Sequence, residues 1–492
     1  MKKQIKYLLA AFCIVAIAGC AADYDSDGGL SYMGLVNSIT SEDNSGDKFS
    51  DFTDNPFISC KEQNVSTFSV DADGASYAIM RKYVSGGWKI PASAVRIEEF
   101  LNYFTFDYAE PQDGNTVAIN AEVAACPWNA QHKLLRLGIK GKSLSEAEMP
   151  KSNYVFLIDV SGSMDSDDKL PLLKKGLLAM LPELLPDDRI SIITYSGHVE
   201  KLLESTPVND ISKISKAIQK LSASGSTAGG QALVDAYNEA LANYIMGGNN
   251  RVIMGTDGDF NVGVKSTDEL LKIVEQYADK GIFMTVCGFG SGNLNDAMME
   301  TISNRGNGTY EYIDGENQMM KVFVLERGKL ISVACDSKCQ ITFNPDVVDS
   351  YRLIGYENRV MDAEDFGNDA KDAGEIGAGQ TITALYEVVM ANPTAQAKLA
   401  TFDFRYKKSL NDESIPLTLD ITDNQTESAV SENFNFAAGV AAYGMLLRKS
   451  PYKGETTFEM AESLISNSLS FDPHGYRAEL LKIIKKSEDL NK

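Results

Sequence analysis

Short apolar strands that alternate with helices constrain the fold of this chain more than any other feature. The first strand, Tyr154–Ile158, consists only of aliphatic and aromatic residues. Three later segments have the same strand character, and helical segments separate them: Arg189–Tyr195, Arg251–Gly255 and Ile282–Phe289. Strands buried on both faces appear as unbroken apolar runs, and their alternation with helices is typical of a parallel sheet. Residues 151–321 therefore predict an α/β domain with a doubly wound, mostly parallel sheet.

The regions on either side of this domain have different patterns. Shorter alternating strands are predicted both before it and after it, at 117–125, 133–140, 330–333, 340–343, 347–354, 380–389 and 398–406. Such strands are typical of a β-sandwich. We therefore expect a discontinuous sandwich from 117–150 and 322–426, with the α/β domain inserted. Residues 63–116 are predicted as an N-terminal helical region, and residues 427–492 as a C-terminal helical segment.

Composition narrows the classes of partner. The 492 residues exceed the size of one ordinary domain, and 46 Lys and Arg against 68 Asp and Glu give a formal charge of −22. Nucleic acids and anionic membrane faces attract clustered basic residues, so neither is an expected partner. The three histidines, His132, His198 and His474, are far apart in sequence. His-rich zinc sites and histidine-based triads are therefore not expected.

The N-terminus predicts the compartment. Three lysines and a short apolar run through Ala18 have the pattern of a secretory signal peptide, residues 1–19. The run ends in Ile17-Ala-Gly-Cys20, which resembles the lipobox of bacterial lipoproteins. Lipidation of Cys20 would anchor the chain without spanning the bilayer, and the acidic residues 20–62 would form a tether. We expect a lipid-anchored protein of the cell envelope, in the outer membrane of a Gram-negative bacterium; the alternative is a soluble secreted protein.

Five cysteines remain after the signal peptide and Cys20 are set aside. Cys335 and Cys339 are near enough in sequence to form a disulfide, and Cys60 with Cys126 is a second possibility. Cys287 lies in an apolar strand pattern and is expected to be a buried thiol. A metal site on the CxxxC pair is less favoured, because no second Cys or His pair accompanies it.

Oxygen-bearing side chains gather where strands of the α/β domain end. Asp159, Ser161 and Ser163 follow the first strand, Thr227 precedes a helix, and Asp257 follows the strand 251–255. Ligands of open α/β sheets bind beyond the carboxyl ends of the strands, so these residues are expected to meet. Carboxylate and hydroxyl oxygens suit a hard divalent ion, Mg²⁺ or alternatively Mn²⁺ or Ca²⁺.

The DxSxS motif, the threonine and the aspartate of Thr256-Asp257-Gly258 resemble the metal-ion-dependent adhesion site of von Willebrand factor type A (VWA) domains. This resemblance implies a Rossmann-like fold, with Ser161, Ser163 and Thr227 coordinating the metal and Asp159 and Asp257 acting directly or through water. It also implies a protein partner that offers an Asp or Glu carboxylate to the metal. The segments Phe68–Asp71 and Arg96–Phe104 are similar to a bacterial subfamily with an added N-terminal region and a C-terminal domain of unknown role.

Two other functions remain open at this stage. The metal could only brace the fold of a structural envelope scaffold, or it could activate water in a hydrolase. No general base with a suitable neighbour is apparent, so the sequence favours a binding protein that is not an enzyme.

Away from the metal loops, Asp71 and Asp73 are expected to cap the helix that follows them.

Overall fold

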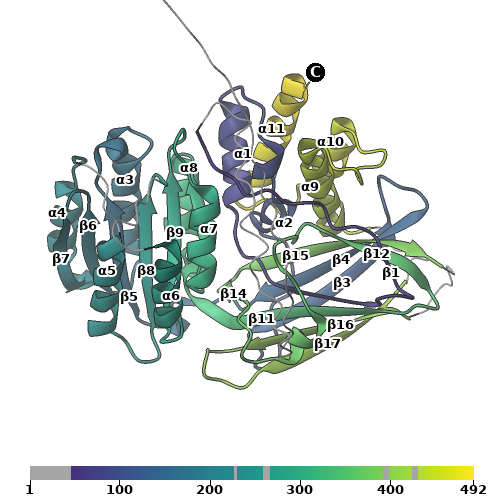
Figure 1. Cartoon of the computed structure of the whole chain (residues 1–492), viewed down its shortest axis with the longest axis horizontal. Helices are drawn as coiled ribbons and strands as arrows, with labels where there is room; N and C mark the ends of the chain where they lie inside the picture. Colours follow the sequence, from purple (N-terminus) through teal and green to yellow (C-terminus); the bar gives the residue numbers. More distant parts are fainter. Residues whose placement is uncertain (1–45, 226–229, 259–265, 392–397, 424–429, 492) are drawn as a thin grey trace, which may run out of the picture. The chain divides into compact units, whose positions relative to one another are not determined.

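The structure is a computed structural model that describes residues 46–225, 230–258, 266–391, 398–423 and 430–491 (Figure 1). Cys20 with the signal peptide, and Thr227, lie outside these residues. Within them, the chain forms an α/β domain, two antiparallel sheets and a set of helices (Figure 1). Among the described helices, none combines the length and the apolar character needed to cross a bilayer.

The α/β domain has a six-stranded sheet with the order β10-β9-β8-β5-β6-β7. All neighbouring strands are parallel except β6 and β7. The strands are β5 (Ser152–Asp159), β6 (Arg189–Tyr195), β7 (Val199–Pro207), β8 (Asn249–Thr256), β9 (Ile282–Phe289) and β10 (Tyr310–Ile313). The helices are α3 (Leu170–Met180), α4 (Ile211–Lys220), α5 (Gly230–Ala242), α6 (Thr267–Ala278), α7 (Asp296–Arg305) and α8 (Glu316–Met320). The predicted fold class is confirmed.

Strand β5 shows why its sequence is apolar throughout. Val155 and Leu157 belong to one buried cluster, which includes residues of α5, α6 and α7. Phe156 and Ile158 belong to another, which includes residues of α3, α4 and α8. Alternate side chains of a strand point to opposite faces, so each face of this sheet has its own helical cover.

The antiparallel edge strand β7 was not predicted. Seven of its nine residues are exposed or partly buried, and three of them, Glu200, Lys201 and Glu204, are charged. An edge strand that faces solvent carries such residues without loss of pairing, so it lacks the continuous apolar signal of its neighbours. The segment therefore resembles a polar connection when only the sequence is considered.

The remaining strands form two sheets that share one core. One has the order β1-β12-β15-β4-β3, the other β13-β2-β11-β16-β17, with β14 paired to β11. Their bounds are β1 (Ile58–Ser59), β2 (Val65–Ser69), β3 (Val117–Ala125), β4 (His132–Gly141), β11 (Ser332–Phe343), β12 (Val348–Ile354), β13 (Val360–Met361), β14 (Gly374–Gly377), β15 (Thr381–Met390), β16 (Lys398–Lys407) and β17 (Ile415–Thr422). Strand β4 precedes the α/β domain in sequence but pairs with β15, which follows it.

Strand β2 joins this sandwich from the region expected to be helical. It pairs with β11 in antiparallel register, and Phe68 enters the core beside Tyr356 and Tyr386. The residues of β2 do not by themselves specify a partner strand. A pairing across more than 260 residues depends on which sheet edge is free, and this is a tertiary property.

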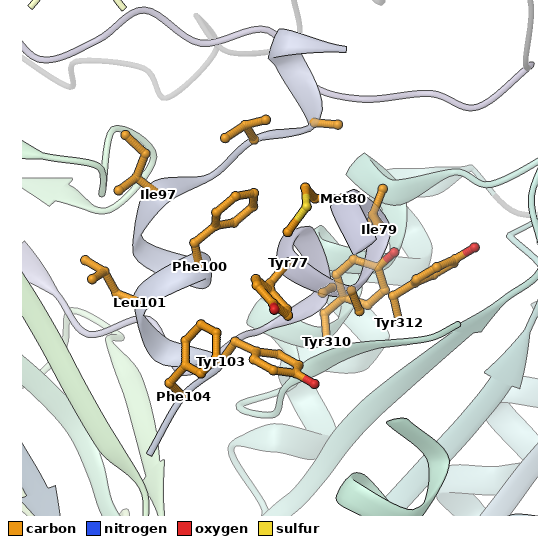
Figure 2. Close-up of a cluster of buried hydrophobic side chains, with 14 of the residues drawn as sticks. Tyr77, Ile79, Met80, Ile97, Phe100, Leu101, Tyr103, Phe104, Tyr310 and Tyr312 are labelled. Atoms are coloured by element: carbon orange, nitrogen blue, oxygen red, sulfur yellow. The ribbon is translucent and has the colours of Figure 1, made fainter. Parts of the chain in front are cut away.

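Helices from both ends of the chain pack together beside the α/β domain. They are α1 (Ala75–Ser85), α2 (Ile97–Asn102), α9 (Glu432–Arg448), α10 (Phe458–Ser466) and α11 (Tyr476–Asn491). Figure 2 shows side chains of α1 and α2 directed toward each other and toward Tyr310 of β10. The Tyr77 ring stacks on Tyr103 at 4.1 Å, and Phe104 meets Phe436 of α9 edge to face at 4.9 Å. Aromatic contacts of this kind bury large apolar areas.

The suggested Cys335–Cys339 disulfide is not present. All five cysteines in the described part of the chain are buried free thiols. Cys335 and Cys339 both lie on β11, where their partners on β16 are Lys407 and Phe404. Four residues along a strand span roughly 13 Å, whereas a disulfide joins Cα atoms only about 4.4–6.8 Å apart. The alternative pair, Cys60 and Cys126, is also free.

A buried carboxyl in α2 predicts a pH effect on stability. Burial, with the charges of Glu357 and Asp71, raises the pKa of Glu98 to about 8, and its Oε2 lacks a hydrogen-bond partner among the described residues. The native state therefore keeps a proton that the unfolded chain releases above pH 4.5, so stability is lost as pH rises toward 8. Glu98→Gln should stabilise the fold by roughly 3 kcal/mol at pH 9 and change it little at pH 4. Urea unfolding at the two pH values tests this, and equal effects at both would contradict it.

Candidate metal centre

The predicted site lies at the carboxyl edge of the parallel sheet. Asp159 is the last residue of β5, and Asp257 directly follows the neighbouring strand β8. Backbone hydrogen bonds join the loops at this edge: Val160 N donates to Tyr195 O at 2.9 Å, and Ser224 N donates to Val160 O at 2.7 Å. Gly162 N donates to Gly225 O at 3.0 Å. The loop that leads toward Thr227 is thus bonded to the DxSxS loop.

Asp159 is completely buried and only partly hydrogen bonded. Its Oδ1 accepts a bond from Ser161 N at 2.8 Å, whereas Oδ2 is buried without a hydrogen-bond partner among the described residues. Burial raises the pKa of Asp159 to about 6, and the charge of Asp257 adds to the rise; hydrogen bonds from Ser161 and the nearby Tyr195 hydroxyl oppose it. An ionised carboxylate in this position gains from a cation, because burial without a partner is costly.

The two serines of the motif are adjacent. Ser161 Oγ and Ser163 Oγ lie 3.0 Å apart, with Ser161 buried and Ser163 exposed. Ser161 directly precedes the short turn Gly162–Asp165, and Ser163 lies within it. Hydroxyl oxygens spaced in this way can serve as neighbouring ligands of one small cation.

Asp257 is surrounded by hydrogen-bond donors. Lys169 Nζ lies 2.9 Å from its Oδ2, and the two groups form a buried ion pair. Burial alone would raise the pKa of Asp257, but hydrogen bonds from Lys169, Ser163 and Asn293 hold it below its ordinary value. Asp257 therefore stays ionised and links the serine loop to the loop after β9.

The residues fit a hard divalent cation. A carboxylate with an unshared buried oxygen, two hydroxyls and a second ionised carboxylate form an all-oxygen set, and Mg²⁺, Mn²⁺ and Ca²⁺ prefer such ligands. The structure brings together Asp159, Ser161, Ser163 and Asp257, as predicted. The remaining predicted ligand, Thr227, lies outside the described residues. Lys169 was not predicted, although the sequence places it only six residues after Ser163.

A second cluster of acids is formed by residues of α2 and of the segment before α1. Asp71, Asp73 and Glu99 are buried and place carboxylate oxygens within 4.8 Å of one another, a spacing that could also hold a metal. The expected helix cap is wrong, because neither aspartate caps α1. Instead, Asp73 Oδ1 accepts a bond from Tyr310 N of β10 at 2.7 Å, and Asp71 pairs with Arg359 at 3.1 Å. These acids connect the helices to the α/β domain and the sandwich.

Known proteins match three parts of the chain. A family model described as von Willebrand factor type A domain matches residues 153–323, one described as von Willebrand factor matches 43–136, and one described as YfbK, C-terminal, matches 328–490. The uncharacterized protein YfbK of Escherichia coli (strain K12) is 38% identical over 465 residues, which is 89% of this chain and 80% of the relative. The uncharacterized protein sll0103 of Synechocystis is 28% identical over 192 residues, 38% of this chain and 44% of that protein.

Solved structures similar to this chain include VWA proteins. A von Willebrand factor type A protein from Catenulispora acidiphila has a TM-score of 0.44 at 14% identity, covering 76% of this chain and 91% of that one. The ArnB paralog VWA2 from Sulfolobus acidocaldarius has a TM-score of 0.38 at 14% identity, covering 76% and 98%. The long alignment with the Escherichia coli relative, together with the three family models, shows that this chain belongs to the YfbK family of proteins with a VWA domain.

Proposed function

We propose that this chain is a lipid-anchored protein of the cell envelope that binds a protein partner through a divalent cation. VWA domains mediate protein interactions, which supports the general class. The observation that carries the proposal is the meeting of Asp159, Ser161, Ser163 and Asp257 at one sheet edge, with a buried oxygen of Asp159 unshared. The site binds and does not catalyse.

The ligand set explains how an acidic protein could capture another acidic group. Asp159, Ser161 and Ser163 would hold the cation, Mg²⁺ or alternatively Mn²⁺ or Ca²⁺, and the cation would supply positive charge at an otherwise acidic edge. Neutral hydroxyls do not cancel that charge, so an Asp or Glu carboxylate of a partner can complete the coordination. Asp257 would orient Ser163 through the hydrogen bond that it accepts from this residue.

The first described residues are hydrogen bonded to a loop at this edge. Asp47 Oδ1 accepts hydrogen bonds from Gly292 N at 2.7 Å and Leu294 N at 3.0 Å. These residues belong to the loop after β9, which also contains Asn293, a hydrogen-bond donor to Asp257.

Partner capture from envelope extracts tests the function. Purified protein should retain the same partner proteins in Mg²⁺ and release them in EDTA, and Asp159→Ala should capture none of them in either buffer. Asp167→Ala, an exposed acid on the same loop, serves as the matched control and should behave like the wild type. Capture of the same proteins by Asp159→Ala would contradict the proposal.

Two measurements separate the alternatives. If the metal only braces a scaffold, EDTA should lower the melting temperature while partner capture persists. If the chain is a hydrolase, turnover of an ester or phosphate substrate should disappear in Asp257→Ala. We expect neither result.

A further inference from the structure

We propose that Lys169 is a built-in cation that weakens metal binding and strengthens the attraction of the bound metal for a partner carboxylate. This inference rests on the proposed function and names a residue that tunes the same site. It starts from the buried ion pair between Lys169 and Asp257, the motif carboxylate that also accepts a hydrogen bond from Ser163.

The position of Lys169 is built by three elements. The residue immediately precedes α3, and its side chain is 10% exposed beside an Asp257 side chain of 0%. The residue that faces the lysine side chain is Gly290, in the loop after β9. A Cβ atom at this position would lie 2.1 Å from Lys169 Cε. Gly290 also has a φ of +73°, which favours glycine. The glycine-rich loop therefore leaves room for the lysine stem and directs its ammonium to Asp257.

The ion pair changes the charge of the site. Asp159 and Asp257 together contribute −2, and Lys169 reduces this to −1. A divalent cation then leaves a net charge of +1, whereas without the lysine the same complex would be neutral. In a buried site, one unit of charge a few ångströms from a bound ion strongly changes the affinity of the site for that ion. The lysine should therefore oppose the cation and favour an anionic partner group.

Substitution of Lys169 should have opposite effects on the binding of metal and of carboxylate. Lys169→Met removes the charge but keeps an unbranched stem of similar shape, so Mg²⁺ should bind about tenfold more tightly. A carboxylate ligand should bind to the metal-loaded variant about tenfold more weakly. If Lys169 had only a structural role, its substitution would not raise the affinity for Mg²⁺ while lowering the affinity for the carboxylate.

The experiment uses the full mature chain and two probes. Calorimetry measures the affinity for Mg²⁺ alone. Binding of a short peptide with one aspartate to the Mn²⁺-loaded protein is followed by the relaxation of water protons, with the asparagine peptide as a blank. Lys175→Met, on the exposed side of α3 with a side chain 61% exposed, is the control and should match the wild type. Lys169→Arg keeps the charge and should also remain near the wild type.

The outcomes distinguish the two proposals. If the wild type binds no Mg²⁺, the proposed function fails. If the wild type binds Mg²⁺ but Lys169→Met has the same affinities for metal and peptide, only the role of Lys169 is wrong. If Lys169→Met is unfolded without metal, Mg²⁺ should restore its melting transition, because the cation replaces the lost partner of Asp257; failure of Mg²⁺ to do so, with Lys169→Arg folded, would overturn the inference.

Discussion

Asp159→Ala should lower the affinity for Mg²⁺ by more than about 100-fold. The loss of a residue that only supports a metal ligand already costs roughly 10–100-fold, and Asp159 provides the one motif oxygen that is buried without a hydrogen-bond partner among the described residues. Calorimetry on the wild type and the variant measures this difference. Asp167→Ala, which removes an exposed acid from the same loop, should retain wild-type affinity.

The same variant should keep its fold in EDTA. Asp159 carries a pKa of about 6 because of its burial, so its ionised form costs stability at neutral pH. The alanine variant loses the hydrogen bond that Ser161 N donates to Asp159 Oδ1, but it also loses the free-energy cost of burying an ionised carboxylate. Equal Mg²⁺ affinities for Asp159→Ala and the wild type would show that the cation does not use this carboxylate.

Arg96→Met should destabilise the folded chain by about 3–5 kcal/mol. Arg96 lies just before α2 and contacts Asp296 of α7 with both terminal nitrogens, Nη1 at 2.6 Å and Nη2 at 3.1 Å; it also pairs with Glu99. Its side chain is 4% exposed and those of both acids are 0% exposed. Removing one partner leaves buried carboxylates without their cation, which is far more costly than losing a surface pair.

Urea unfolding measures this effect, with Arg305→Met as the matched control. Arg305 pairs with Glu275 at 2.6 Å on the surface, where the side chains are 52% and 40% exposed. Such a pair contributes about 0–1 kcal/mol. If both variants lost the same small amount, the buried network around Arg96 would not hold the helices to the α/β domain.

Much of the α/β domain could be predicted because its buried strands are short continuous apolar runs in the sequence. Strand β5 is apolar at every position since both of its faces are covered, and the DxSxS motif follows the strand at the sheet edge where ligands bind. Edge strand β7 escaped prediction because one side of it faces solvent. The disulfide was wrong because proximity in sequence is not proximity in space along an extended strand.

The sequence by itself determined the α/β class and the motif that brings Asp159, Ser161 and Ser163 together, because unbroken apolar strands and a five-residue motif are local properties. Only the tertiary structure decided the partners of isolated charges. Lys169 meets Asp257 across 88 residues, and Arg96 meets Asp296 across 200. No local pattern encodes such pairs. They form because a buried charge must find an opposite charge among whichever side chains the packed elements bring beside it.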